Sequence, residues 1–183
     1  MSIVLVGSTS GSITLQEPAV AGTTVLTLPA VTGTVLTTTS PKVGNVLQVI
    51  QPPVYTTPFS TSSGTPVSTG FSATITPTSA SSQILVIAYS TLGVPTGGMN
   101  GNIDLRRGTS TTIASNFYKT FGAADYLNAA FTGVYLDSPA TTSSTTYYLY
   151  AYRDGAAGTF YVGARRDGDS PITTSITLME IAG

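Results

Sequence analysis

The chain after residue 44 is a series of strand-length segments separated by short stretches rich in Gly, Pro, Ser and Asp. In VSTGFSATIT, residues 67–76, the side chains of Phe71, Ala73 and Ile75 fall on one face of an extended chain, and Ser and Thr fall on the other. A period of two predicts a strand with one buried face, which is typical of antiparallel sheets. This repeated pattern constrains the fold more than any other feature of the sequence.

Further segments of strand length follow one another at the spacing of a β-sandwich or barrel. The segment QILVIAYSTL is apolar on both faces, so we expect it to lie centrally in the core. The segment 52–66 is rich in proline and is expected to be a loop. We therefore predict a jelly-roll-like antiparallel β-sandwich. The strands that we expect are residues 45–51, 67–76, 83–92, 102–107, 111–120, 127–137, 145–153, 159–166 and 173–182.

The scarcity of charge supports an all-β chain. Charged residues make up 8% of the 183 residues, against about 25% in an average soluble domain. Exposed helix faces usually carry Glu and Lys, yet the only such residues here are Glu17, Glu180, Lys42 and Lys119. Thr, Val, Ile and Tyr, which suit a pleated surface, are abundant instead.

The first forty residues differ from the rest in containing a near-repeat. The segment ITLQEPAVAGT, residues 13–23, is closely followed by the similar LTLPAVTGT, residues 26–34. This segment is too short to bury a core of its own. Its composition is more apolar than that of a disordered tail. We expect residues 1–43 to form a short extended β-arm that oligomerises, with a cyclic homotrimer as the leading candidate. Residues 44–183 would form the sandwich. The expected oligomer and virion contacts of the arm are Ile13, Leu15, Val25, Leu26, Leu28, Val31, Val35 and Leu36.

A tyrosine row in TTYYLYAYR is the more specific candidate for binding. A five-residue loop, 154–158, suggests a hairpin between residues 145–153 and 159–166, which would place the row on one face with Phe160 and Val162. Tyrosine suits carbohydrate or protein contacts, but a row of period two also fills cores or trimer seams. The loops 93–101 and 119–126 are alternative contact points. The candidate receptor contacts are Tyr148, Tyr150 and Tyr152.

The residue inventory argues against catalysis. The chain contains no His and no Cys, so the common nucleophile–base pairs are missing. A D-x-D spacing within residues 165–170 lacks the other ligands of a calcium loop. We expect no catalytic residue, no metal and no cofactor. The aspartates fall near predicted strand ends and are expected to form turns; they are Asp104, Asp125, Asp137, Asp154, Asp167 and Asp169.

Two classes of partner are also disfavoured. The net charge is −1 and no basic patch could neutralise phosphates, so we expect no nucleic-acid binding. No segment is long and apolar enough to span a bilayer, and the apolar start lacks the basic region of a signal peptide. The arginines are expected to pair with Asp104, Asp154 or Asp167; they are Arg106, Arg107, Arg153, Arg165 and Arg166.

The string GSITLQEPAVAGTTVLTLPAVTGTVLTT, residues 11–38, resembles a segment of bacteriophage tail-fibre and other virion proteins that often precedes a receptor-binding or knob domain. The later part resembles the C-terminal domains of tail-fibre-like proteins of marine and cyanobacterial phages. The matching residues there are Ile75-Thr76-Pro77, Ile84-Leu85-Val86, Thr145-Thr146-Tyr147 and Ser175 through Ile181.

This resemblance implies a non-enzymatic virion protein, assembled in the host cytoplasm as a trimeric tail fibre or knob for host-surface attachment. Its partners would be two further copies, other phage virion proteins, and a host cell-surface glycan or protein. A capsid decoration or head-fibre protein, anchored to the shell by the arm, is the alternative. A bacterial adhesin or carbohydrate-binding module would need a secretion signal, and an enzyme would have to act on host polysaccharide.

Overall fold

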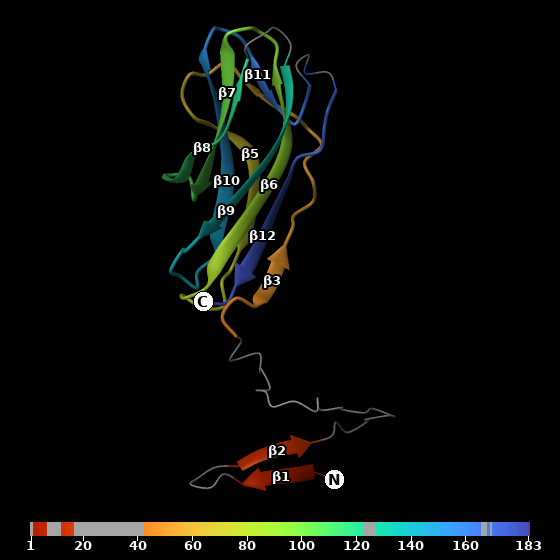
Figure 1. Ribbon diagram of the computed structural model, residues 1–183, viewed down its shortest axis with the longest axis vertical. Helices are drawn as coiled ribbons and strands as arrows, with labels where there is room; N and C mark the ends of the chain where they lie inside the picture. The colour runs from red at the N-terminus through yellow and green to blue at the C-terminus, as the bar shows by residue number, and fades with distance from the viewer. Residues whose placement is uncertain (1, 7–11, 17–41, 123–126, 166–167, 169) are drawn as a thin grey trace. The chain divides into compact units, whose positions relative to one another are not determined.

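The computed structural model describes residues 2–6, 12–16, 42–122, 127–165, 168 and 170–183 (Figure 1). The chain divides into two compact units, Met1–Val35 and Leu36–Gly183.

The first unit contains an antiparallel pair of strands, β1 (Ser2–Val6) and β2 (Ser12–Gln16). Its register places Ile13 opposite Leu5 and Leu15 opposite Ile3. Ile13 and Leu15 are two of the expected arm contacts, and their role as contacts stays a prediction, as do the trimer and the division at residue 43. The remaining expected contacts lie outside the described residues; they are Val25, Leu26, Leu28, Val31, Val35 and Leu36.

The second unit is built of strands, and its described residues contain no helix, so none there has the length and apolar character needed to cross a membrane. Each strand segment expected from the sequence overlaps an observed strand. The short strand β4 is an addition, since it lies within the segment 52–66 that we expected to be a loop. The bounds are β3 Val46–Ile50, β4 Phe59–Thr61, β5 Val67–Ile75, β6 Gln83–Val94, β7 Met99–Arg107, β8 Thr111–Phe121, β9 Leu127–Asp137, β10 Thr145–Gly155, β11 Phe160–Val162 and β12 Ser175–Ile181.

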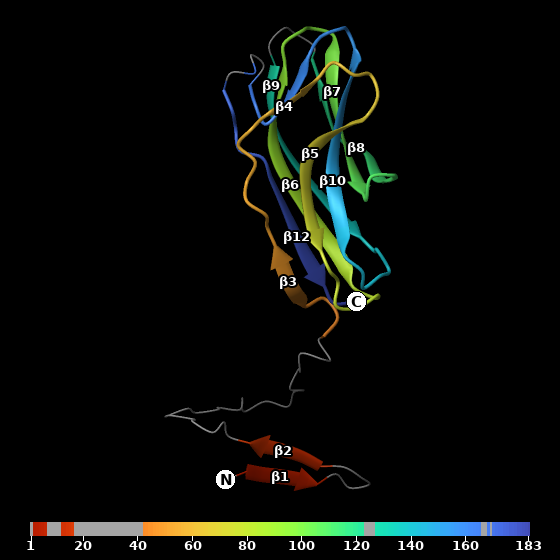
Figure 2. The same cartoon turned by 180° about the vertical axis from the view of Figure 1, so that it is seen from behind.

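The strands form two antiparallel sheets that pack face to face. One sheet has the order β3-β12-β6-β9 and lies in front in Figure 1, and the other has the order β5-β10-β7-β8 and lies in front in Figure 2. The short β11 continues along β6 beyond β12 and also pairs with β4. The pairs are nested along the chain, with β7·β8 innermost, then β6·β9, β5·β10 and β3·β12. Nested pairing divided between two sheets in this way is the jelly roll, so the predicted fold class is confirmed.

The expected hairpin between residues 145–153 and 159–166 is wrong. β10 pairs with β5 and β7 in one sheet, whereas β11 pairs with β4 and β6 in the other. The short connection 156–159 therefore carries the chain from one sheet to the other. Phe160 and Val162 are fully buried between the sheets and do not share a face with the tyrosine row.

The core lies between the two sheets and is formed mainly by alternate residues of β5, β6, β7, β9, β10 and β12. Phe71, Ala73 and Ile75 point into it as the alternation predicts, with exposures of 2–4%. Packing is close enough to require glycine at Gly101, where a Cβ atom would lie 2.1 Å from Cε2 of Phe160. Such a substitution would force the buried ring to shift, which is the usual cost of overfilling a core.

A polar cluster joins the two sheets at one edge of the core. The Asp137 carboxylate on β9 accepts hydrogen bonds from Arg107 Nη1 on β7, at 2.9 and 3.1 Å, and from the Tyr147 hydroxyl on β10, at 2.7 Å. Burial and the neighbouring Asp137 raise the pKa of Tyr147 above its ordinary range, so the hydroxyl remains a donor. Arg107 therefore pairs with Asp137, and not with any aspartate expected from the sequence.

A second buried carboxylate, Glu180 on β12, joins three segments and is 0% exposed. Its oxygens accept hydrogen bonds from Gln48 Nε2 on β3, at 2.6 Å, and from the backbone N–H and hydroxyl of Thr78, each at 2.7 Å. Burial opposes ionisation, but the hydrogen bonds, led by that from Gln48, outweigh it and hold the pKa of Glu180 below its ordinary value.

The lowered pKa of Glu180 predicts acid sensitivity of the fold. A carboxyl group whose pKa is lower when folded contributes stability above its unfolded pKa and loses it as pH falls through the folded pKa. We expect the free energy of unfolding to decrease as pH falls below about 5, and Glu180→Gln to flatten this decrease. Urea unfolding at a series of pH values measures the slope. Asp154, whose pKa is also lowered, leaves a residual slope in the variant; equal slopes in both proteins would refute the role of Glu180.

Candidate functional site

The tyrosine row lies on the outer surface of the β5-β10-β7-β8 sheet. Strand β10 alternates, so that Tyr147, Leu149 and Ala151 are fully buried in the core while the predicted contacts Tyr148, Tyr150 and Tyr152 are on the opposite face. The alternative that the row fills the core of the sandwich is therefore wrong. Tyr148 and Tyr152 are partly exposed and Tyr150 is 9% exposed.

Tyr150 is covered by an arginine from the neighbouring strand. The Cζ atom of Arg106 on β7 lies 4.0 Å from the centroid of the Tyr150 ring, a cation–π distance. Arg106 Nη1 and the Tyr150 hydroxyl both donate to the carbonyl oxygen of Thr109, at 3.3 and 3.4 Å. The guanidinium and the ring therefore form one fixed, stacked pair in the middle of the face.

Tyr152 is held by a distortion in β8. Asn116 has φ of +49°, and its backbone N–H donates to the buried Asp104 carboxylate at 2.8 Å. Its side-chain Oδ1 accepts a hydrogen bond from the Tyr152 hydroxyl at 3.1 Å. Partial burial and the charges of Asp104 and Asp154 raise the pKa of Tyr152, so its hydroxyl remains protonated. Asp104 thus lies inside a strand, and the expectation that it forms a turn is wrong.

An ion pair continues the face beyond Tyr152. Lys119 Nζ on β8 lies 2.8 Å from Asp154 Oδ2 on β10, and the side chains of Asn100 and Asn102 also donate to this carboxylate. The hydrogen bond from Lys119, followed by that from Asn100, lowers the pKa of Asp154, so the carboxylate is charged at neutral pH. Both partners are partly exposed, so the pair contributes only about 0–1 kcal/mol to stability.

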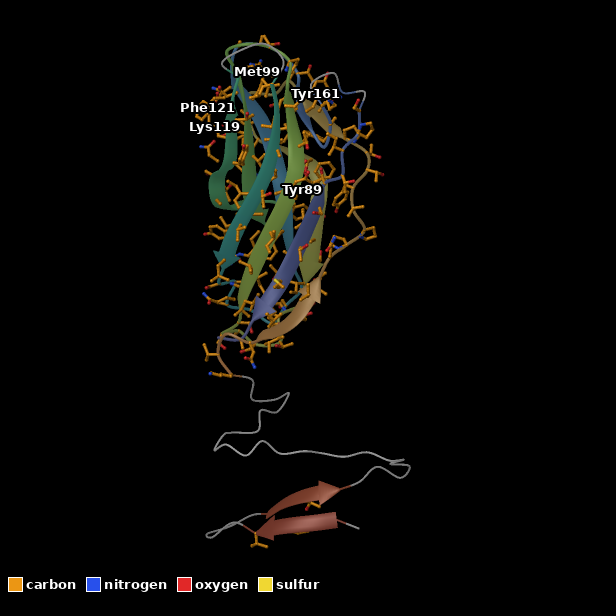
Figure 3. All side chains as sticks on the ribbon, turned by 45° about the vertical axis from the view of Figure 1, so that its right-hand side comes forward. Tyr89, Met99, Lys119, Phe121 and Tyr161 are labelled. Carbon is orange, nitrogen blue, oxygen red and sulfur yellow. The ribbon has the colours of Figure 1, made fainter. Side chains whose placement is uncertain are left out.

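An exposed aromatic ring ends the face. Phe121 on β8 is 67% exposed, and Lys119 Nζ lies 5.4 Å from the centroid of its ring. Figure 3 shows the two side chains next to each other on β8. The structure thus brings Lys119 and Phe121, which begin the predicted contact segment 119–126, onto the same face as Tyr152. Residues 123–126 of that segment lie outside the described residues.

We call this surface the tyrosine face, defined by Tyr148, Tyr150, Tyr152, Arg106, Asn116, Lys119 and Phe121. Buried beneath it, Arg106 Nε and Asn102 Oδ1 have no hydrogen-bond partner among the described residues. Such unmet groups are uncommon in native structures. Aromatic rings beside fixed amide, ammonium and guanidinium groups are suited to contacts with carbohydrate or protein.

The sequence indicates that Tyr148, Tyr150 and Tyr152 share one face, whereas Arg106 and Asn116 were not predicted as their partners; the role of the tyrosines as receptor contacts stays a prediction. The alternation in NIDLRR places Asn102, Asp104 and Arg106 on one face, and this signal was available from the sequence. Among the described residues, no group of three or more His, Cys, Asp or Glu side chains is placed to hold a metal ion.

No protein-family model matches the chain, and no curated protein matches it. Among solved structures, T=1 particles derived from infectious bursal disease virus overlap with 97% of this chain and 44% of that chain, at 16% identity and a TM-score of 0.39. A mutant VP2 protein of the same virus gives the same coverage, at 14% identity and a TM-score of 0.42. The chain therefore spans less than half the length of these proteins. Overlaps of this extent identify neither a family nor an activity, and the fold assignment rests on the strand order.

Proposed function

We propose that the protein is a non-enzymatic structural protein of a bacteriophage virion, and that it acts as a homotrimeric fibre or knob that attaches the particle to the host surface. In this proposal residues 1–43 hold the protein to the particle, and the jelly roll presents the tyrosine face to a host glycan or protein. The virion assignment comes from the resemblance of residues 11–38 and of the later motifs to tail-fibre proteins.

The observation that carries the binding role is the fixed geometry of the tyrosine face. Arg106 holds the Tyr150 ring, Asn116 holds the Tyr152 hydroxyl, and Asp154 holds Lys119. Side chains that are already fixed lose little conformational entropy when they bind a partner. A weak contact by each of three copies would then become effective through multivalency.

The junction with the arm is built to transmit a pull on the domain. The N–H of Gly44 donates to the carbonyl of Ala182 at 2.7 Å, and the N–H of Ala182 donates to the carbonyl of Asn45 at 2.8 Å. The chain entering the jelly roll is therefore tied to the end of β12, which pairs with both β3 and β6. Tension on residue 42 would be spread over two ladders of the sheet.

The test is adsorption of the purified, fluorescently labelled full chain to host cells. We expect the double variant Tyr148→Ala, Tyr152→Ala to lose at least about tenfold in apparent affinity, because tyrosine is enriched among the few contact residues whose truncation costs about 2 kcal/mol or more. Tyr161→Ala is the matched control, since Tyr161 lies on β11 in the other sheet (Figure 3). Equal melting temperatures of the three proteins would exclude a folding defect.

Unchanged adsorption by the double variant would contradict binding through the tyrosine face. The attachment role as a whole would fail if the unmodified chain did not adsorb to host cells. Gold-labelled antibodies against the chain locate it on the particle: label on the tail supports the fibre, and label on the head supports the capsid decoration or head-fibre alternative.

A further inference from the structure

The outer surface of the β3-β12-β6-β9 sheet is apolar along its centre. One cross-strand row runs from Val49 through Met179 and Leu85 to Leu136, and the next contains Ile87 and Val134. Along each strand, the residues that alternate with these point into the core. The side chains of both rows therefore point outward. We call this surface the apolar face, defined by Val49, Met179, Leu85, Leu136, Ile87, Val134, Tyr89 and Ile181.

Several of these side chains are exposed in the single chain. Val134 is 58% exposed, Val49 52%, Leu136 49% and Tyr89 40%. Figure 3 shows Tyr89 on the surface of β6, midway along the sheet. A central strand that is apolar on both faces is typical of a sheet covered on both sides, and β6 has this pattern although, within the second unit, the described residues cover only its inner face.

No charged side chain interrupts the apolar face. The charged residues of its four strands are Asp137 and Glu180, and both are buried on the inner side, at 7% and 0% exposure. Solvent-exposed sheet surfaces usually carry charged groups that keep them soluble and discourage association. A lipid surface is a poorer partner than protein, because the face offers no Lys or Arg to interact with anionic headgroups.

The size of the face is of the same order as a contact between two copies. Four strands about 4.8 Å apart and about eight residues long, at about 3.4 Å per residue, give a footprint of about 500 Å². Side chains standing on a sheet expose more area than its flat footprint, and a stable protein contact buries about 800 Å² of accessible surface per partner.

We propose that the apolar face is a contact surface between copies of this chain. In a symmetric oligomer the same surface recurs on each copy, so an uncharged face of Val, Leu, Ile and Met can meet an equally uncharged neighbour without leaving a charge unpaired. In a trimer this face would turn toward the three-fold axis, where the apolar side chains of the three copies would meet. This contact involves the jelly roll itself, in addition to the arm contacts expected from the sequence.

Sedimentation velocity of the full chain over a range of concentrations tests the proposal. We expect an oligomer, and we expect Val134→Glu to weaken association at least about tenfold, because the contact would bury an unpaired carboxylate. Thr74→Glu is the control, since Thr74 is an exposed residue of β5 in the other sheet. A monomeric unmodified chain at tens of micromolar, or a Val134→Glu variant with unchanged association, would overturn the proposal.

Crosslinking gives a readout that does not depend on destabilising the oligomer. The chain contains no cysteine, so Val134→Cys reacts with a short bifunctional maleimide only at that position. We expect covalent dimers from Val134→Cys and none from Thr74→Cys at equal concentration. Equal yields from the two variants would show that the apolar face does not lie between copies, and would point to coverage by the arm or by another protein.

Discussion

Replacing Phe131 with alanine is expected to lower the free energy of unfolding by about 3–5 kcal/mol, the usual cost of removing a buried aromatic ring. Phe131 on β9 is fully buried. Its ring centroid lies 5.9 Å from that of Phe117, edge to face, and 5.1 Å from that of Tyr118. These rings fill the space between β8 and β9, which are edge strands of the two sheets. Removing the Phe131 ring would leave a cavity at this edge, beyond which the described residues form no further strand.

Equilibrium urea unfolding measures this effect. Phe121→Ala removes the same ring from an exposed position on β8 and is expected to cost less than about 1 kcal/mol. If Phe131→Ala changed the free energy of unfolding no more than Phe121→Ala does, the packing between β8 and β9 described above would be wrong.

Replacing Asp137 with alanine is the second large expected effect, a loss of about 2–3 kcal/mol, because hydrogen bonds to a buried charged group are costly to leave unmade. The variant would leave the Tyr147 hydroxyl and the Arg107 guanidinium without their carboxylate partner. The Tyr147 hydroxyl is fully buried, and the Arg107 guanidinium is about one-third exposed. The lost contact joins β9 in one sheet to β7 and β10 in the other.

Asp154→Ala is the matched control, because Asp154 also accepts hydrogen bonds from a cation and from neutral donors, but at the surface. We expect it to cost no more than about 1 kcal/mol. Similar losses for both variants in thermal or urea unfolding would contradict the view that Asp137 joins the sheets.

Most of the fold could be predicted from the sequence because the strands have strong local signals. The period-two pattern and the turn residues located every long strand, and the strand number and spacing favoured a jelly roll. Pairing was harder to predict, because alternation reports which side chains share a face and not which strand lies alongside. The short connection after β10 looked like a hairpin for this reason, although it crosses between the sheets.

The candidate site was predicted in part. Tyr148, Tyr150 and Tyr152 were found because consecutive alternate tyrosines are visible in one segment. Arg106 and Asn116 were missed as their partners because they come from β7 and from an irregular part of β8, where the +49° φ of Asn116 shifts the register. For β6, the expectation of a central position was correct, but no described residue of the second unit covers its apolar outer face.

We propose that the two outer faces of the jelly roll have different tasks, one toward sister copies and one toward the host. A cryo-EM map of the intact particle tests this most directly. We predict projecting density that fits residues 42–183 in several copies, with the apolar face turned toward a neighbouring copy and the tyrosine face open to solvent. Particles that lack the chain, or a map in which the tyrosine face is buried against the shell, would contradict the account.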